Sequence, residues 1–137
     1  MKKAGSIVAG TLKYLKELSK PGIKTAWLDA MAEDHIRALG GIPSFKGYRG
    51  YKHATCLSIN EQVVHGIPGS RELLPGDIIG IDVGVMLDGY HADSALTVAI
   101  GAISPEAQRL MDATQEGLLA GRNAIRPGEK LGAIGHA

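Results

Sequence analysis

The sequence contains very little cysteine: Cys56 is the only one among 137 residues. A single thiol excludes an internal disulfide and fits a reducing compartment, so we predict a cytoplasmic location. Long apolar runs are also missing, and with them any sign of a secretory signal peptide or a membrane-spanning helix. The formal net charge is only +1, so the composition gives no reason to expect nucleic acid or a membrane as a partner.

The composition that remains is that of a folded domain. Hydrophobic residues make up 45% of the sequence and charged residues 21%, a balance typical of globular rather than disordered chains. The length is that of one domain. Apolar residues at helical spacing predict a first helix over residues 5–18. Thr25 is the predicted N-cap of a second helix that reaches Leu39.

A third helix is predicted after Ser104, because serine is a favoured N-cap and Pro105 fits the first helical position. Its buried stripe is expected to consist of Ala107, Leu110, Met111, Thr114 and Leu118. Residues 131–137 have the pattern of the first turns of a fourth helix. The sequence stops there without a C-cap, which suggests a truncated polypeptide.

The longest extended pattern lies between residues 78 and 100. Two apolar, β-branched runs flank Asp88-Gly89, a dipeptide that favours a type I′ hairpin turn because both of its residues accept positive φ. A two-residue turn at this point places Gly84 opposite Asp93. The sequence therefore predicts a β-hairpin with a defined register.

Strand alternation puts Asp82 and Asp93 on one face of this hairpin as diagonal neighbours, with Cβ atoms about 7–8 Å apart. Two converging carboxylates can bind a small cluster of divalent cations. The alternative is a solvated sheet face, which we consider about equally common. The apolar surroundings of Asp82 favour the metal, since an unpaired carboxylate there is costly, and Gly84 is expected to leave room beside Asp93. The opposite face is almost wholly apolar and carries Ile81, Val83, Val85, Leu87, Tyr90, Ala92 and Leu96.

Between the helices and the hairpin, residues 42–56 have a loop-like pattern in which glycines and aromatic residues alternate with basic residues. Such a loop can line a pocket or form a packed connection. A short strand is predicted over residues 56–59. His65 is predicted at the end of a further strand, before a loop. A lone histidine is usually structural, but beside a carboxylate pair it is a candidate acid, base or hydrogen-bond donor.

Three stretches together resemble the type I methionine aminopeptidases: residues 56–68, residues 81–84 and residues 91–94. Further similarity at both ends extends the resemblance over essentially the whole sequence. The spacing of the two aspartates is shared with Xaa-Pro peptidases, whereas the histidine and cysteine motifs favour the methionine-specific branch. The resemblance implies an α+β fold, the first half of a pita-bread (creatinase/aminopeptidase) fold, with an antiparallel β-sheet covered by helices.

The resemblance also implies roles for individual residues. Asp82 is similar to the ligand that chelates one metal ion, and Asp93 to the carboxylate that bridges two ions. His65 is similar to a catalytic histidine that hydrogen-bonds the substrate near the scissile amide. The pocket that receives the methionine side chain is expected to include Tyr48, Tyr51 and Cys56, together with His65.

The family's reaction is removal of the N-terminal methionine from nascent proteins that have a small second residue. Two divalent ions (Co, Mn, Fe or Zn) activate a bridging water, and the resulting hydroxide attacks the carbonyl of the first residue. Nascent peptides are therefore the expected partners, and the ribosome is a further candidate.

The family's metal site also needs a histidine and two glutamates from a second half of the fold, which this sequence does not contain. We therefore expect residues 1–137 to be the N-terminal half of a catalytic domain with part of the metal site. The missing half is expected to leave an apolar face of the hairpin and a sheet edge uncovered, which would favour self-association. Two other functions stay open: an Xaa-Pro peptidase-like hydrolase, and a non-catalytic pita-bread module that binds peptides or ribosomes. The presence of both aspartates argues against the module.

Overall fold

A long central strand, β3 (Ile78–Leu87), organises the first part of the chain, Met1–Ile103. It pairs along its whole length with β4 (Tyr90–Ala99). Its other edge pairs with β1 (Ile42–Pro43) and β2 (Thr55–Ile59), and every pairing is antiparallel. The computed structural model describes every residue from Met1 to Ala137.

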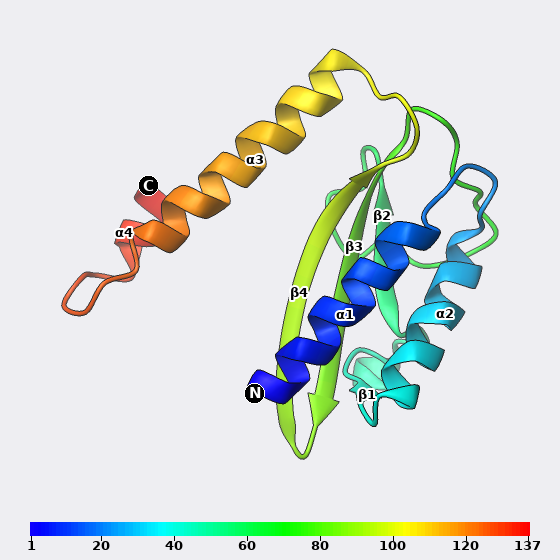
Figure 1. Cartoon of the computed structure of the whole chain (residues 1–137), viewed down its shortest axis with the longest axis horizontal. Coiled ribbons are helices and arrows are strands. Elements are labelled where there is room, and N and C mark those ends of the chain that lie inside the picture. The colour runs from blue at the N-terminus through cyan, green and yellow to red at the C-terminus, as the bar shows by residue number, and fades with distance from the viewer. The chain divides into compact units, whose positions relative to one another are not determined.

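Two helices, α1 (Lys2–Leu18) and α2 (Thr25–Ala38), lie on one face of this sheet (Figure 1). The face they cover is the apolar face of the hairpin, so the expectation that an apolar hairpin face is left uncovered is wrong, because both helices pack on it. Fully burying one aliphatic side chain contributes about 1.5–3 kcal/mol, so this layer is the main source of stability for the sheet. The core contains residues from both helices and from β3, among them Ile7, Val8, Leu12, Leu15, Leu28, Ala32, Ile36, Ile79, Ile81, Val83 and Val85.

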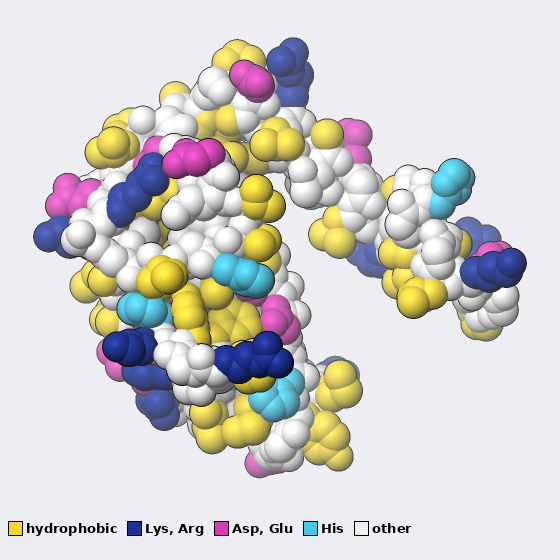
Figure 2. All heavy atoms as spheres, turned by 180° about the vertical axis from the view of Figure 1, so that it is seen from behind, with side chains coloured by type: hydrophobic (Ala, Val, Ile, Leu, Met, Phe, Trp, Pro, Cys, Tyr) yellow, Lys and Arg dark blue, Asp and Glu magenta, His cyan; other side chains and the backbone are white.

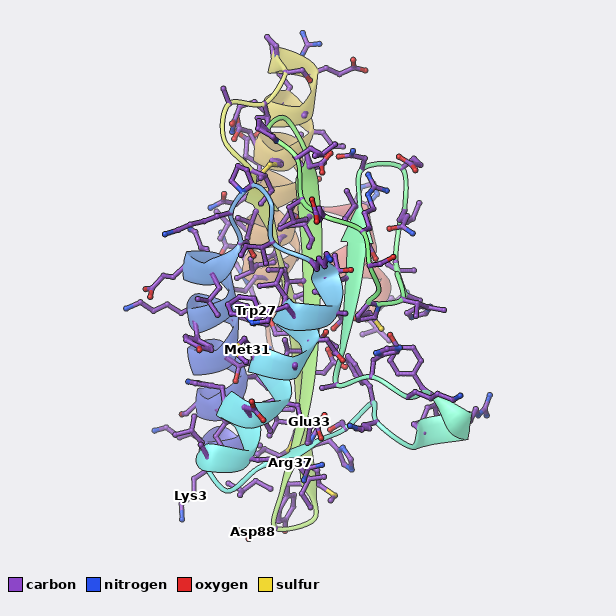
Figure 3. The ribbon with its side chains drawn as sticks, turned by 90° about the vertical axis from the view of Figure 1, so that its right-hand side faces the viewer. Lys3, Trp27, Met31, Glu33, Arg37 and Asp88 are labelled. Atoms are coloured by element: carbon purple, nitrogen blue, oxygen red, sulfur yellow. The ribbon has the colours of Figure 1, made fainter.

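The hairpin has the predicted turn and register. Asp88 and Gly89 form the turn with φ values of 52° and 78°, and Asp88 lies at its tip (Figure 3). Gly84 faces Asp93, as expected. Asp82 and Asp93 consequently share the face of the sheet opposite α1 and α2.

Two local predictions are wrong, because contacts from distant residues decide the conformation. Thr25 is inside α2 rather than its N-cap, and its hydroxyl accepts a hydrogen bond from the Gly69 N–H at 2.9 Å. No strand forms over residues 63–68. His65 has a φ of 58°, in the left-handed region, which interrupts an extended strand.

Ser104–Ala137 forms a second compact unit that contains α3 (Pro105–Asn123) and α4 (Gly132–His136). Ser104 caps α3 as predicted, with its Oγ accepting a hydrogen bond from the Ala107 N–H at 3.1 Å. The predicted stripe of α3 is not buried: Leu110 is 59% exposed and Leu118 is 71% exposed. Within this unit, the five-residue α4 is too short to cover that stripe. None of the chain's helices combines the length and apolar composition needed to cross a bilayer.

Candidate functional site

The predicted site residues gather on the sheet face opposite α1 and α2. The strand register places Cys56 of β2, Asp82 of β3 and Ala95 of β4 in one row across three strands. The next row on the same face holds Gly84 and Asp93. Figure 2 views the molecule from this side and shows histidine and acidic side chains among hydrophobic ones. The short side chains of Ala95 and Gly84 leave the two carboxylates as the main polar groups of these rows.

Asp82 is a partly buried carboxylate with an unsatisfied oxygen. Its Oδ1 is shielded from solvent and has no hydrogen-bond partner. Burial and the negative charge of Asp93 raise the pKa of Asp82 from 3.8 to about 6, while His65 lowers it. A buried, unpartnered carboxylate oxygen is costly, and a cation beside it would offset both burial and repulsion. Paired carboxylate oxygens suit divalent cations.

The pair contributes two protein ligands. No group of three or more His, Cys, Asp or Glu side chains is arranged to hold a metal ion in this chain. Three or more protein ligands are usual in stable zinc sites. Asp82 and Asp93 therefore fit a part of a metal centre.

Cys56 and Tyr51 form a wall next to Asp82. Burial raises the pKa of the Cys56 thiol, and the Asp82 carboxylate adds to the rise. A neutral, buried thiol acts as an apolar surface rather than a nucleophile. The Tyr51 O–H donates to the Thr55 carbonyl at 2.8 Å, and burial, followed by the neighbouring Cys56, raises the pKa of the Tyr51 phenol. Both side chains therefore stay uncharged near neutral pH.

Tyr48 is not brought to this wall. It is 66% exposed in a short 3-10 turn, η1 (Tyr48–Gly50), where the Arg49 guanidinium lies 5.5 Å from its ring centroid.

Phe45 comes to the site in a way that the sequence reasoning missed. A side chain at Gly84 would place its Cβ 2.6 Å from Cε1 of Phe45, so the aromatic ring lies directly over Gly84, which faces Asp93. The expectation that Gly84 leaves open space is therefore wrong, because the ring fills that space. A glycine inside a strand is a signal of such close approach.

His65 reaches the site from a loop fixed to β2. The Leu57 N–H donates to the Gly66 carbonyl at 2.8 Å, and the Gly66 N–H donates to Ser58 Oγ at 3.0 Å. Gly66 packs so closely on β2 that a side chain there would collide with the Leu57 carbonyl. These contacts hold the neighbouring His65 in its left-handed conformation. Its imidazole is exposed and close enough to Asp82 to lower the pKa of that carboxyl.

Comparison with known proteins gives one family for the whole chain. The model of metallopeptidase family M24 matches residues 1–137. Methionine aminopeptidase 1 of Bacillus subtilis is 52% identical over 137 residues, which is all of this chain and 55% of that protein. The methionine aminopeptidase of Clostridium acetobutylicum is 47% identical, again over all of this chain and 55% of that protein. The chain spans about half the length of the curated relatives it matches.

Solved structures agree with these relatives. The methionine aminopeptidase from Rickettsia prowazekii matches with a TM-score of 0.95 and 36% identity, over 97% of this chain and 54% of that one. The enzyme from Thermotoga maritima matches with a TM-score of 0.96 and 37% identity, over 99% of this chain and 55% of that one. Prolidase from Pyrococcus furiosus has a TM-score of 0.86 but only 19% identity, a likeness of fold alone.

Proposed function

Because this chain belongs to metallopeptidase family M24, we propose that it is the N-terminal half of a methionine aminopeptidase catalytic domain. The predicted fold class is confirmed: an antiparallel sheet covered by helices, matching about half of each pita-bread relative. The proposed activity is removal of the N-terminal methionine from nascent proteins that have a small second residue. Relatives with 40–52% identity are named methionine aminopeptidases, which supports this substrate class.

The observation that carries the proposal is that Asp82 and Asp93 lie in neighbouring rows on one sheet face, and that Asp82 Oδ1 is buried without a hydrogen-bond partner. We propose that both carboxylates would hold divalent metal. Bound Co, Mn, Fe or Zn would lower the pKa of a water and stabilise negative charge on the peptide carbonyl oxygen. The remaining ligands have to come from outside these 137 residues, because this chain offers no third one at the pair.

The other site residues are proposed to bind and orient the substrate. The exposed His65 imidazole, fixed by its left-handed backbone, donates a hydrogen bond near the scissile amide. The uncharged Cys56 and Tyr51 side chains contact the methionine side chain, whose flexible thioether suits an apolar wall. Phe45 extends this surface beside Asp93. Tyr48 is assigned to the pocket by resemblance, and its exposed position leaves that assignment a prediction.

The predicted partners beyond peptide substrates rest on the sequence. Binding to the ribosome, self-association through the sheet and a cytoplasmic location all stay predictions. The Xaa-Pro peptidase alternative has support at the level of fold only, since the prolidase match is 19% identical.

A two-step experiment tests the proposed function. Calorimetric titration of the chain with Mn²⁺ or Co²⁺ should detect binding that Asp93→Asn weakens at least about tenfold, a change of about 1.4 kcal/mol. Asp34→Asn is the matched control, because Asp34 is an exposed aspartate on α2. Methionine release from Met-Ala-Ser is then measured with Mn²⁺ or Co²⁺ present. Under each metal condition in which the wild type releases methionine, Asp93→Asn should release none.

The competing functions give different results. Release of alanine from Ala-Pro-Ser without release of methionine would select the Xaa-Pro peptidase. Equal metal binding by the wild type and Asp93→Asn, with no cleavage of either peptide, would favour the non-catalytic module.

A further inference from the structure

A buried carboxylate, Asp29 of α2, lies on the helix-covered side of the sheet, away from the candidate metal ligands. It is 8% exposed and has no part in the proposed reaction. Its Oδ1 accepts three hydrogen bonds, from the N–H groups of Ala54 and Thr55 at 2.9 and 2.8 Å and from the Thr55 hydroxyl at 2.7 Å. Its Oδ2 lies 3.2 Å from Nδ1 of His53. One carboxylate thus contacts three consecutive residues.

The three residues lead directly into the pocket wall. Thr55 opens β2, and Cys56 follows it. Because side chains alternate along a strand, Thr55 points toward α2 while Cys56 points to the opposite face, beside Asp82. The Thr55 carbonyl accepts the hydrogen bond from the Tyr51 hydroxyl at 2.8 Å. The backbone that Asp29 holds therefore presents both wall residues.

The bonds to Asp29 are strong enough to fix this backbone. Hydrogen bonds to an ionised carboxylate are roughly twice as strong as neutral ones. The amides of Ala54 and Thr55 are buried, and a buried amide left without a hydrogen-bond partner is destabilising. Loss of the Asp29 carboxylate would therefore release residues 53–55 from their present position.

Asp77 provides an internal comparison. It is 6% exposed and accepts hydrogen bonds from Asn60 Nδ2 at 2.8 Å and from the Leu74 N–H at 2.9 Å. Asp77 directly precedes β3, and the groups it holds belong to no candidate site residue. The two aspartates are alike in burial and bonding, and only Asp29 holds the pocket wall.

We propose that Asp29 is a positioning residue that, through the backbone of residues 53–55, sets Cys56 and Tyr51 against Asp82 and so determines how tightly the methionine side chain is bound. This proposal rests on the proposed function. Asp29 acts on the wall and lies on the far side of the sheet from the metal ligands, so it affects KM and leaves kcat nearly unchanged.

Steady-state release of methionine from Met-Ala-Ser is the first test. Asp29→Ala should raise KM at least about tenfold and change kcat less than about twofold, the pattern of lost substrate binding. Asp29→Asn keeps one side-chain oxygen for the two amides and should return KM to within about threefold of wild type. Asp77→Ala should lower stability without changing KM. Thr55→Val is the substitute test if Asp29→Ala fails to fold. It removes only the hydrogen bond from the Thr55 hydroxyl and should raise KM by about threefold.

Alkylation of Cys56 by iodoacetamide at one fixed pH is the second test, and it needs no catalysis. Cys56 is the only cysteine, so the signal is unambiguous. Labelling should be at least about tenfold faster in Asp29→Ala than in wild type, Asp77→Ala or Asp29→Asn. Asp29→Asn is the control for charge, because the Asp29 carboxylate also raises the pKa of the Cys56 thiol and asparagine removes that charge while it keeps an oxygen for the two amides. If the wild type releases no methionine, these 137 residues do not carry out the reaction alone, and the labelling by itself decides the role of Asp29. Equal KM and equal labelling in the Asp29→Ala and Asp77→Ala variants would overturn the proposal.

Discussion

Replacing Asp82 with asparagine should stabilise the metal-free chain and abolish its metal binding. Asparagine keeps the shape of the side chain and removes the charge, which burial and Asp93 disfavour. A pKa raised from 3.8 to about 6 corresponds to about 3 kcal/mol for a fully buried group. Asp82 is partly exposed and water screens its charge, so we expect a gain of about 1 kcal/mol, or a rise in Tm of about 4 °C.

The pH dependence of this gain has a definite sign. The folded chain keeps the Asp82 proton at pH values where the unfolded chain has lost it, because the folded-state pKa is the higher one. The destabilisation is therefore absent below pH 3.8, grows as the pH rises toward about 6, and is fully present above that. The difference in free energy of unfolding between Asp82→Asn and wild type should follow this curve.

Urea unfolding followed by circular dichroism, at about pH 4 and about pH 7, measures the difference. With EDTA at about pH 7, Asp82→Asn should unfold at a higher urea concentration than wild type. With Mn²⁺, only the wild type should gain stability, because ligands that bind the folded state stabilise it. A variant less stable than wild type in EDTA at about pH 7 would mean that the Asp82 carboxylate is satisfied in the native state, and the reasoning would be refuted.

Three further substitutions test other parts of the structure. Gly66→Ala creates a collision with β2; it should cost about 2 kcal/mol or more in urea unfolding and lower methionine release, and unchanged stability would contradict the packing described. Gly84→Ala would place a Cβ 2.6 Å from the Phe45 ring; it should displace the ring and raise KM for Met-Ala-Ser, whereas an unchanged KM would remove Phe45 from the pocket. Glu33 lies beside Arg37 on α2 (Figure 3). The hydrogen bond from Lys46 lowers the pKa of the Glu33 carboxyl below 4.5, although burial opposes this. The ionised carboxylate therefore stabilises the fold above that pH, and the stabilisation is lost as the pH falls. Glu33→Gln should therefore cost at most about 1 kcal/mol near neutral pH, a difference that thermal unfolding in high salt should no longer detect.

The hairpin could be predicted in detail because its determinants are local. Asp88-Gly89 selects the turn, and strict alternation then decides which side chains share a face. The convergence of Asp82 and Asp93 follows from those two facts alone. The register in the structure agrees at every predicted pair.

The remaining features depend on contacts between distant residues, which no local pattern encodes. Threonine is a favoured N-cap residue, yet Thr25 lies inside the helix, where its hydroxyl is hydrogen-bonded to Gly69. His65 has a β-branched run before it, yet the packing of Gly66 on β2 forces a left-handed turn. Phe45 reaches Gly84 only because β1 is paired with β3. Tertiary packing overrides local propensity in each case.

The two-residue turn at Asp88-Gly89 also has a consequence for the order in which the site assembles. The candidate metal ligands are joined by the most local part of the sheet, whereas Cys56 must close a much longer loop to reach Asp82. Loop closure becomes more costly as the intervening chain lengthens. We therefore expect the two carboxylates to meet before the pocket wall forms. A divalent cation present during synthesis could then act as a template for the hairpin, ahead of the surface that recognises methionine.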